Sequence, residues 1–197
     1  MKRKHVFLAI TLVSLVVLAV IIVTLVRSKV PNTEFYQDNK VSFSYPTTWQ
    51  SSLCGSEGST LQPSGTLKGV NGDENSYPLV LKGFAWAECD NKSLVFSEND
   101  ETEECASDDY IHQKIKNNLV ISYYKYDGIV QKIYIQKKPC AKEPLFVFGF
   151  YDSKQDPRSF SIENLTKSAP MGLPYEKLRK SEQLKEVVAF AESIKIK

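Results

Sequence analysis

The chain has 197 residues, of which 42% are hydrophobic and 24% charged, an ordinary globular composition once an apolar N-terminal block is set aside. The formal charge is +2, but five of the 25 basic residues flank that block, so 20 basic residues remain against 23 acidic ones. The mildly acidic remainder lacks a basic stripe, which excludes nucleic-acid binding. The five flanking cations are Lys2, Arg3, Lys4, Arg27 and Lys29.

Residues 6–26 form the apolar block. They carry no charged side chain, and the run is long enough to cross about 30 Å of hydrocarbon as a helix. A cleaved signal peptide is the alternative, but its apolar region usually has about 7–15 residues and a small-x-small exit, neither of which is present. A lipoprotein signal is excluded because the first cysteine is Cys54. We therefore predict an uncleaved signal-anchor helix in a single-pass membrane protein.

The cations on either side of this block predict its direction. Three cations and the amino terminus precede it and two cations follow it, so the positive-inside rule places the N-terminus in the cytoplasm. The two distal cations weaken this bias and keep the opposite orientation as an alternative. We predict a location in the cell membrane, with residues 1–5 as a cytoplasmic tail, 6–26 as the transmembrane helix, 27–39 as a tether and 40–197 as one extracytoplasmic globular domain.

All four cysteines lie in the proposed outer domain, and an even number in an oxidising compartment predicts two disulfides. They are Cys54, Cys89, Cys105 and Cys140. A zinc site or a redox-active pair is the alternative, but both usually show Cys-x-x-Cys spacing, whereas each gap here exceeds about a dozen residues. Of the three possible pairings we favour a local Cys89–Cys105 bridge with a long-range Cys54–Cys140 bridge.

The first half of the domain shows strand and loop signals. Residues 41–45 alternate apolar and polar side chains, which is typical of a strand with one buried face, and Pro46 ends it. Glycine and serine are frequent from 53 to 75, which predicts loops with a short strand at about 60–68. Residues 78–87 are apolar and aromatic enough for a buried strand.

An acidic stretch at 90–109 then predicts that part of this segment is a solvated loop. At its end, Ser107, Asp108 and Asp109 favour the start of a helix running to about 117. Tyr110, Ile111 and Ile115 are spaced for one face of that helix.

Residues 127–128, Asp-Gly, give the strongest hairpin signal, because this pair supplies the positive φ angles of a type I′ turn between runs at 119–126 and 129–136. Residues 144–152 predict a further strand. A helix follows at about 181–193, with apolar residues on one stripe that should pack on the sheet. The stripe consists of Leu184, Val187, Val188 and Ala191. Strands followed by a helix, with an antiparallel hairpin, predict an α+β fold.

Three short patterns suggest a family. Phe35 precedes the run Val41-Ser42-Phe43-Ser44-Tyr45-Pro46-Thr47-Thr48-Trp49, a Tyr126-Asp127-Gly128 turn follows, and the chain ends in Ser193-Ile194-Lys195-Ile196-Lys197. Together they resemble the PsbP-like superfamily, which includes an extrinsic subunit of photosystem II and many bacterial lipoproteins and membrane-anchored proteins.

The resemblance implies a central antiparallel β-sheet flanked by helices, an α/β/α sandwich, that serves as a binding or assembly module without shared catalytic residues. The chain departs from the family in its anchor helix, its four cysteines and its acidic stretch, and nothing in it supports a photosynthetic role. Trp49 has a structural explanation, because its large apolar face can cover a sheet edge while the indole N–H finds a partner.

Catalytic signals are sparse. The domain contains one histidine, His112, which we interpret as an exposed helix residue beside Asp108 and Asp109. No Gly-x-Ser-x-Gly, phosphate-binding loop or His-Glu-x-x-His is present, so we predict no cofactor and no enzyme activity. Weak Ca²⁺ candidates occur in the acidic stretch, but the Asp-x-Asp-x-Asp-Gly spacing is missing and a solvated loop is the simpler interpretation. These candidates are Glu98, Asp100, Glu101, Glu103 and Glu104.

The sequence therefore favours a membrane-anchored, non-catalytic extracytoplasmic domain that binds a partner protein or envelope component. The alternative is an extracytoplasmic ligand- or cation-binding sensor, or an enzyme whose active site matches no known motif.

Overall fold

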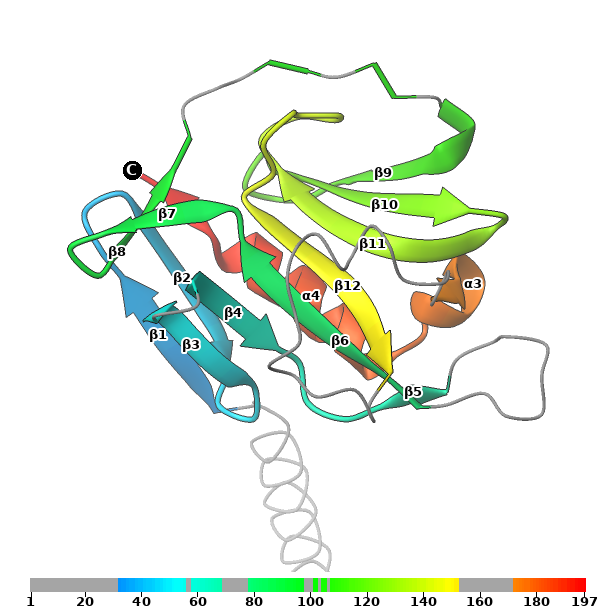
Figure 1. Cartoon of the computed structure of the whole chain (residues 1–197), viewed down its shortest axis with the longest axis horizontal. Coiled ribbons are helices and arrows are strands. Elements are labelled where there is room, and N and C mark those ends of the chain that lie inside the picture. Colours follow the sequence, from blue (N-terminus) through cyan, green and yellow to red (C-terminus); the bar gives the residue numbers. More distant parts are fainter. Residues whose placement is uncertain are drawn as a thin grey trace, which may run out of the picture. The chain divides into compact units, whose positions relative to one another are not determined.

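The computed structural model describes residues 32–55, 58–68, 78–97, 101–102, 104–105, 107–152 and 172–197. This part of the chain is mostly β-sheet, with one short 3₁₀ turn and two helices (Figure 1). The elements are β1 (Thr33–Gln37), β2 (Val41–Pro46), β3 (Gln50–Gly55), β4 (Gly58–Gln62), β5 (Leu67–Lys68), β6 (Pro78–Ala85), β7 (Ala87–Asp90), β8 (Ser93–Phe96), η1 (Ser107–Asp109), β9 (Tyr110–Lys114), β10 (Val120–Tyr126), β11 (Ile129–Gln136), β12 (Phe146–Asp152), β13 (Leu173–Pro174), α3 (Tyr175–Leu178), α4 (Glu182–Ser193) and β14 (Lys195–Ile196).

The main sheet runs in the order β3-β4-β6-β12-β11-β10-β9, with β5 added to β6 and β13 added to β11. Two smaller sheets, β1-β2-β14 and β7-β8, accompany it, and every strand pair is antiparallel. Strand β14 pairs with β2 through Lys195–Ser42 and Ile196–Val41, so the end of the chain joins the start of this sheet.

One face of the main sheet carries the aromatic core. Phe146, Phe148 and Phe150 alternate along β12 and are buried, as expected for side chains that share one face of a strand. The Phe190 ring of α4 lies edge-on to Phe146 and Phe148, with centroids 4.9 and 6.1 Å apart. Strand β2 contributes Phe43, whose ring centroid is 5.3 Å from that of Phe190.

Both helices cover this same face. Tyr123, Ile133 and Phe148 are cross-strand partners in β10, β11 and β12, so their side chains point to one side of the sheet. Tyr175 of α3 packs on Tyr123 with ring centroids 5.0 Å apart, and α4 packs on Phe148. The predicted α+β sandwich, with helices on both sides of the sheet, is therefore wrong: the described residues form a mostly β structure, with both helices on one face.

The largest local error in the prediction lies at 108–117, where we expected a helix. Residues 107–109 form only the 3₁₀ turn η1, and β9 follows directly and pairs with β10. Ile111 and Ile115 are four residues apart, a spacing that fits both one helix face and one strand face. Tertiary pairing with β10 decided between them.

The predicted hairpin is confirmed. Strands β10 and β11 pair across a turn in which Asp127 has φ 50° and Gly128 has φ 74°, the positive values that a type I′ turn requires. The other local strand predictions also have counterparts, in β2, β4 to β6 and β12.

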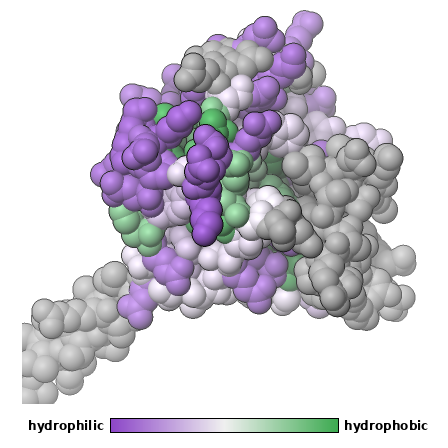
Figure 2. Space-filling model, turned by 60° about the vertical axis from the view of Figure 1, so that its left-hand side comes forward, coloured by the Kyte–Doolittle hydropathy of each residue, from purple (hydrophilic) through white to green (hydrophobic). Residues whose placement is uncertain are grey.

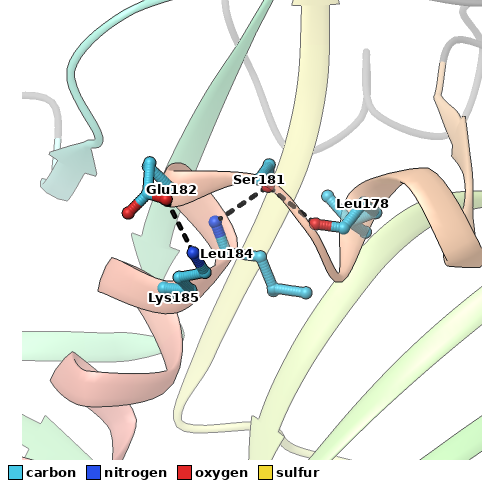
Figure 3. A network of polar contacts seen from close by, with 5 residues as sticks. All are labelled: Leu178, Ser181, Glu182, Leu184 and Lys185. Carbon is cyan, nitrogen blue, oxygen red and sulfur yellow. Dashed lines mark hydrogen bonds and ion pairs between the residues drawn. The ribbon is translucent and has the colours of Figure 1, made fainter.

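The predicted C-terminal helix is also confirmed, as α4, and its N-terminus is capped by Ser181 (Figure 3). The Ser181 hydroxyl accepts a hydrogen bond from the backbone N–H of Leu184 (3.2 Å) and donates one to the carbonyl of Leu178 (2.7 Å). This cap satisfies a backbone donor that the first helical turn leaves unpaired. Glu182 and Lys185 form an ion pair of 2.6 Å on the exposed side.

The prediction of a location in the cell membrane needs correction. Among the described residues, no helix is long and apolar enough to cross a membrane. The predicted cytoplasmic tail (1–5) and transmembrane helix (6–26) lie outside the described residues. Part of the predicted tether, residues 33–37, is strand β1 and pairs with β2.

Candidate functional site

Two disulfides confirm that all four cysteines are bonded, but the pairing that we favoured is wrong. The bridges are Cys54–Cys89 and Cys105–Cys140. Sheet topology explains the difference, because the β7–β8 hairpin contacts β3 and β4 and so brings Cys89 to Cys54. Cys105 and Cys140 meet instead where the segments before η1 and after β11 come together.

His112 lies on β9 beside the second disulfide. Its Nδ1 is 2.9 Å from Oγ of Ser122, its direct partner on β10. Its Nε2 is 4.0 Å from Sγ of Cys105 and 3.9 Å from Sγ of Cys140. The ring stacks on Tyr110 at a centroid distance of 5.8 Å and an interplanar angle of 8°. His112 is exposed, as expected, but it belongs to a strand and not to a helix.

A buried polar chain behind His112 determines which ring nitrogen carries the hydrogen. Gln136, 4% exposed, donates from Nε2 to the carbonyl of Ala141 (3.0 Å), and its Oε1 accepts the hydroxyl hydrogen of Ser122 (2.7 Å). Ser122 is fully buried and has no second hydrogen to donate. It therefore accepts from Nδ1–H of His112, which leaves the lone pair of Nε2 directed at the two sulfurs.

These three side chains form a potential ligand group for a metal ion. The sulfurs of Cys105 and Cys140 and a ring nitrogen of His112 all lie within 4.8 Å of one another. Zn²⁺ and Cu⁺ prefer thiolates and imidazole as ligands, but the two sulfurs are joined in a disulfide here and would be thiolates only after reduction. This group was not predicted from the sequence, because its members come from separate segments of the chain and show no Cys-x-x-Cys spacing. The only local signal was that the domain's single histidine falls seven residues after a cysteine.

The acidic stretch does not form such a group in the described part of the chain. Glu98, Asp100 and Glu103 lie outside the described residues. Glu104 is exposed, and Glu101 forms an exposed ion pair of 3.5 Å with Lys142. The Lys142 backbone N–H also donates to the Glu101 carbonyl at 2.9 Å, so this part of the stretch holds the segment after β11 in place.

A groove of about 520 Å³ lies beside the β7–β8 hairpin. Trp86 is 38% exposed and Phe96 is half-buried, so two large aromatic side chains border the opening. Figure 2 shows hydrophobic surface bordered by hydrophilic residues on the side of the molecule that carries this hairpin in Figure 1. The groove is lined by Ala85, Trp86, Ala87, Glu88, Val95, Phe96, Ser97 and Glu143.

Asp38 ties the hairpin to the β1–β2 turn. Its Oδ1 accepts from the backbone N–H groups of Lys40 (2.7 Å) and Val41 (2.8 Å), and its Oδ2 accepts from Leu94 N–H (3.1 Å) and the Tyr36 hydroxyl (2.9 Å). Partial burial acts to raise the pKa of Asp38, but these four donors together lower the pKa below its ordinary value. The charged carboxylate is therefore a structural link between β8 and β1.

Trp49 has a structural role and its indole N–H has a partner, as the sequence suggested, but it packs on a central strand and not on a sheet edge. Its side chain is 5% exposed, and its indole Nε1–H donates to Oε2 of Glu186 on α4 at 2.8 Å. The ring packs on Phe148 and Phe190 with centroid distances of 6.0 and 5.6 Å. Trp49 thus joins α4 to the sheet core.

Comparisons of the chain with family models, with curated proteins and with solved structures found no match. The resemblance to the PsbP-like superfamily stays a prediction, and its α/β/α architecture is not what the described residues form.

Proposed function

We propose that this protein is a non-catalytic binding domain of an extracytoplasmic or otherwise oxidising compartment. Its two disulfides support the choice of compartment, because such bonds persist where the medium is oxidising. The observation that carries the binding role is the groove beside β7–β8, which exposes aromatic surface next to carboxylates.

The proposed ligand is an extended segment of a partner protein that places a large apolar side chain next to a lysine or arginine. Trp86 and Phe96 supply a surface for the apolar side chain, and partly exposed aromatic residues are frequent energetic anchors of binding sites. Glu88 and Glu143 line the same groove, and their negative charge favours a neighbouring cation.

A peptide-display selection tests this proposal. Random peptides are selected on the full chain and counter-selected on a Trp86→Ser variant, and binding of the enriched peptides is measured by fluorescence anisotropy. We expect peptides with an aromatic or branched aliphatic residue beside a basic one. Trp86→Ser should weaken their binding by about tenfold or more, and Glu88→Gln or Glu143→Gln by about two- to tenfold.

Tyr126 provides the matched control, because it is an exposed aromatic residue (59%) on the β10–β11 hairpin and not a lining residue of the groove. Tyr126→Ser should leave peptide binding unchanged. The proposal fails if no peptide survives counter-selection on the Trp86→Ser variant, or if the surviving peptides bind the two glutamine variants as tightly as the wild-type chain.

A further inference from the structure

The two disulfides of this protein have the same sequence separation but differ in the side chains that lie next to their sulfurs. Each joins cysteines 35 residues apart, and each has a buried serine in its vicinity. Ser59 contacts the first bridge directly, with Oγ 3.8 Å from Sγ of Cys54 and 3.5 Å from Sγ of Cys89. At the second bridge the imidazole of His112 stands between the buried Ser122 and the sulfurs.

We propose that reduction of the Cys105–Cys140 bridge creates a metal site, in which two thiolates and Nε2 of His112 bind a Zn²⁺ or Cu⁺ ion. The polar chain from Gln136 through Ser122 already holds the required tautomer, with the hydrogen on Nδ1 and the lone pair on Nε2. A metal-bound histidine usually donates its other N–H to a protein acceptor in this manner, and that bond orients the ring.

The distances around Nε2 fit such an ion. With Zn–S bonds of about 2.3 Å and a Zn–N bond of about 2.0 Å, nitrogen and sulfur lie about 3.5–3.8 Å apart in tetrahedral or trigonal coordination. Nε2 is 3.9 and 4.0 Å from the two sulfurs, so the imidazole needs little movement. Only the sulfurs must separate, and both cysteines lie outside the strands, Cys105 before η1 and Cys140 after β11, so the sheet ladder need not change.

The reaction balances with a dithiol as the reductant. A dithiol protein or small dithiol becomes a disulfide and transfers two electrons and two protons to the Cys105–Cys140 bridge, which becomes two thiols. Binding of the ion then releases the two thiol protons, because a metal binds the thiolate form. Three protein ligands leave room for a fourth, from water or a partner, around Zn²⁺. In the reverse direction a disulfide such as oxidised glutathione accepts two electrons and becomes two thiols, the Cys105–Cys140 bridge forms again, and the ion is released. The metal site therefore exists only in the reduced form of the protein.

A redox titration with and without metal tests this inference in the full chain. The protein is equilibrated with mixtures of reduced and oxidised glutathione, with free Zn²⁺ fixed by a metal buffer, and each cysteine pair is quantified by alkylation and mass spectrometry. At free Zn²⁺ 100-fold above the dissociation constant, the ratio of reduced to oxidised Cys105–Cys140 should rise about 100-fold by mass action. The Cys54–Cys89 pair should not respond, which makes it an internal control.

Three variants separate a built site from adventitious binding to thiols. His112→Ala should abolish most of the metal-dependent shift, and Ser122→Ala should weaken Zn²⁺ binding by about 10–100-fold through loss of the orienting hydrogen bond. Ser59→Ala, the matched change at the first bridge, should have no effect. Equal shifts in the wild-type chain and His112→Ala would overturn the proposal, and so would the absence of any shift. If the protein unfolds on reduction, its thiols bind Zn²⁺ without the help of His112. The wild-type chain and His112→Ala then show equal shifts, which also overturns the proposal.

Discussion

The packing of α4 on the sheet depends most on Phe190, and replacing this residue tests the described core. Phe190 is 1% exposed, and its ring contacts those of Phe43, Trp49, Phe146 and Phe148 at centroid distances between 4.9 and 6.1 Å. Substituting a buried phenylalanine by alanine usually costs about 3–5 kcal/mol, through lost apolar burial and the cavity that remains. Because α4 contributes several other buried side chains, we expect Phe190→Ala to fall in this range and not above it.

The assay is urea unfolding of the full chain, followed by far-ultraviolet circular dichroism. Tryptophan fluorescence is unsuitable, because the Trp49 ring lies 5.6 Å from that of Phe190 and would report local change. Phe190→Leu keeps much of the apolar volume and should lose only about 1–2 kcal/mol. Val188→Ala is the matched control, since Val188 lies on the same helix but is only partly buried, and should lose about 1 kcal/mol or less. If Phe190→Ala and Val188→Ala destabilise the protein equally, Phe190 does not anchor the helix.

Three further variants test other parts of the structure. Because the pKa of Asp38 is lowered in the folded protein, its carboxylate stabilises the fold above the unfolded pKa, and this stability is lost as pH falls through the folded pKa. Asp38→Asn should therefore lower the unfolding temperature at pH 7, and the difference from wild type should narrow below about pH 4. A difference in unfolding temperature that is constant with pH would contradict this. A Cβ on Gly83 would overlap the ring of Phe148, its partner on β12, so Gly83→Ala should cost about 1–3 kcal/mol in urea unfolding, and an unchanged midpoint would show that the ring moves aside freely. The Cys54–Cys89 bridge spans 35 residues, for which loop entropy gives about 4 kcal/mol; the double alanine variant should lose about this amount at equilibrium, and a loss below about 1 kcal/mol would argue that the unfolded chain is not constrained by the bridge.

Elements with strong local signals were predictable from the sequence. Asp127 and Gly128 define the β10–β11 hairpin because few residue pairs adopt two successive positive φ angles readily. The C-terminal helix followed from the spacing of its apolar residues, whereas its Ser181 cap became evident only from the structure. Phe190 was absent from the predicted stripe although it lies three residues after Val187, and that spacing was the available signal for it.

Other features depended on contacts between distant segments. The residue pattern at 110–114 fits either a helix or a strand, and hydrogen bonding to the edge of β10 selects the strand. Cysteine pairing depends on which strands become neighbours, so the number of cysteines predicted two bridges without indicating their partners. The position of both helices on one face likewise depends on how β10, β11 and β12 pair with one another. Amino-acid composition does not indicate this pairing.

The sequence by itself determined that this protein has disulfide-bonded cysteines, a type I′ hairpin and an amphipathic C-terminal helix, because each depends on residues that are close in the chain or on their number. Tertiary structure alone decided the environment of His112. Pairing of β9 with β10 places Ser122 on one side of the imidazole, and the folding of two loops places Cys105 and Cys140 on the other. A site made of side chains from separate segments has no local periodicity, and its chemistry becomes visible only when the sheet brings those segments together.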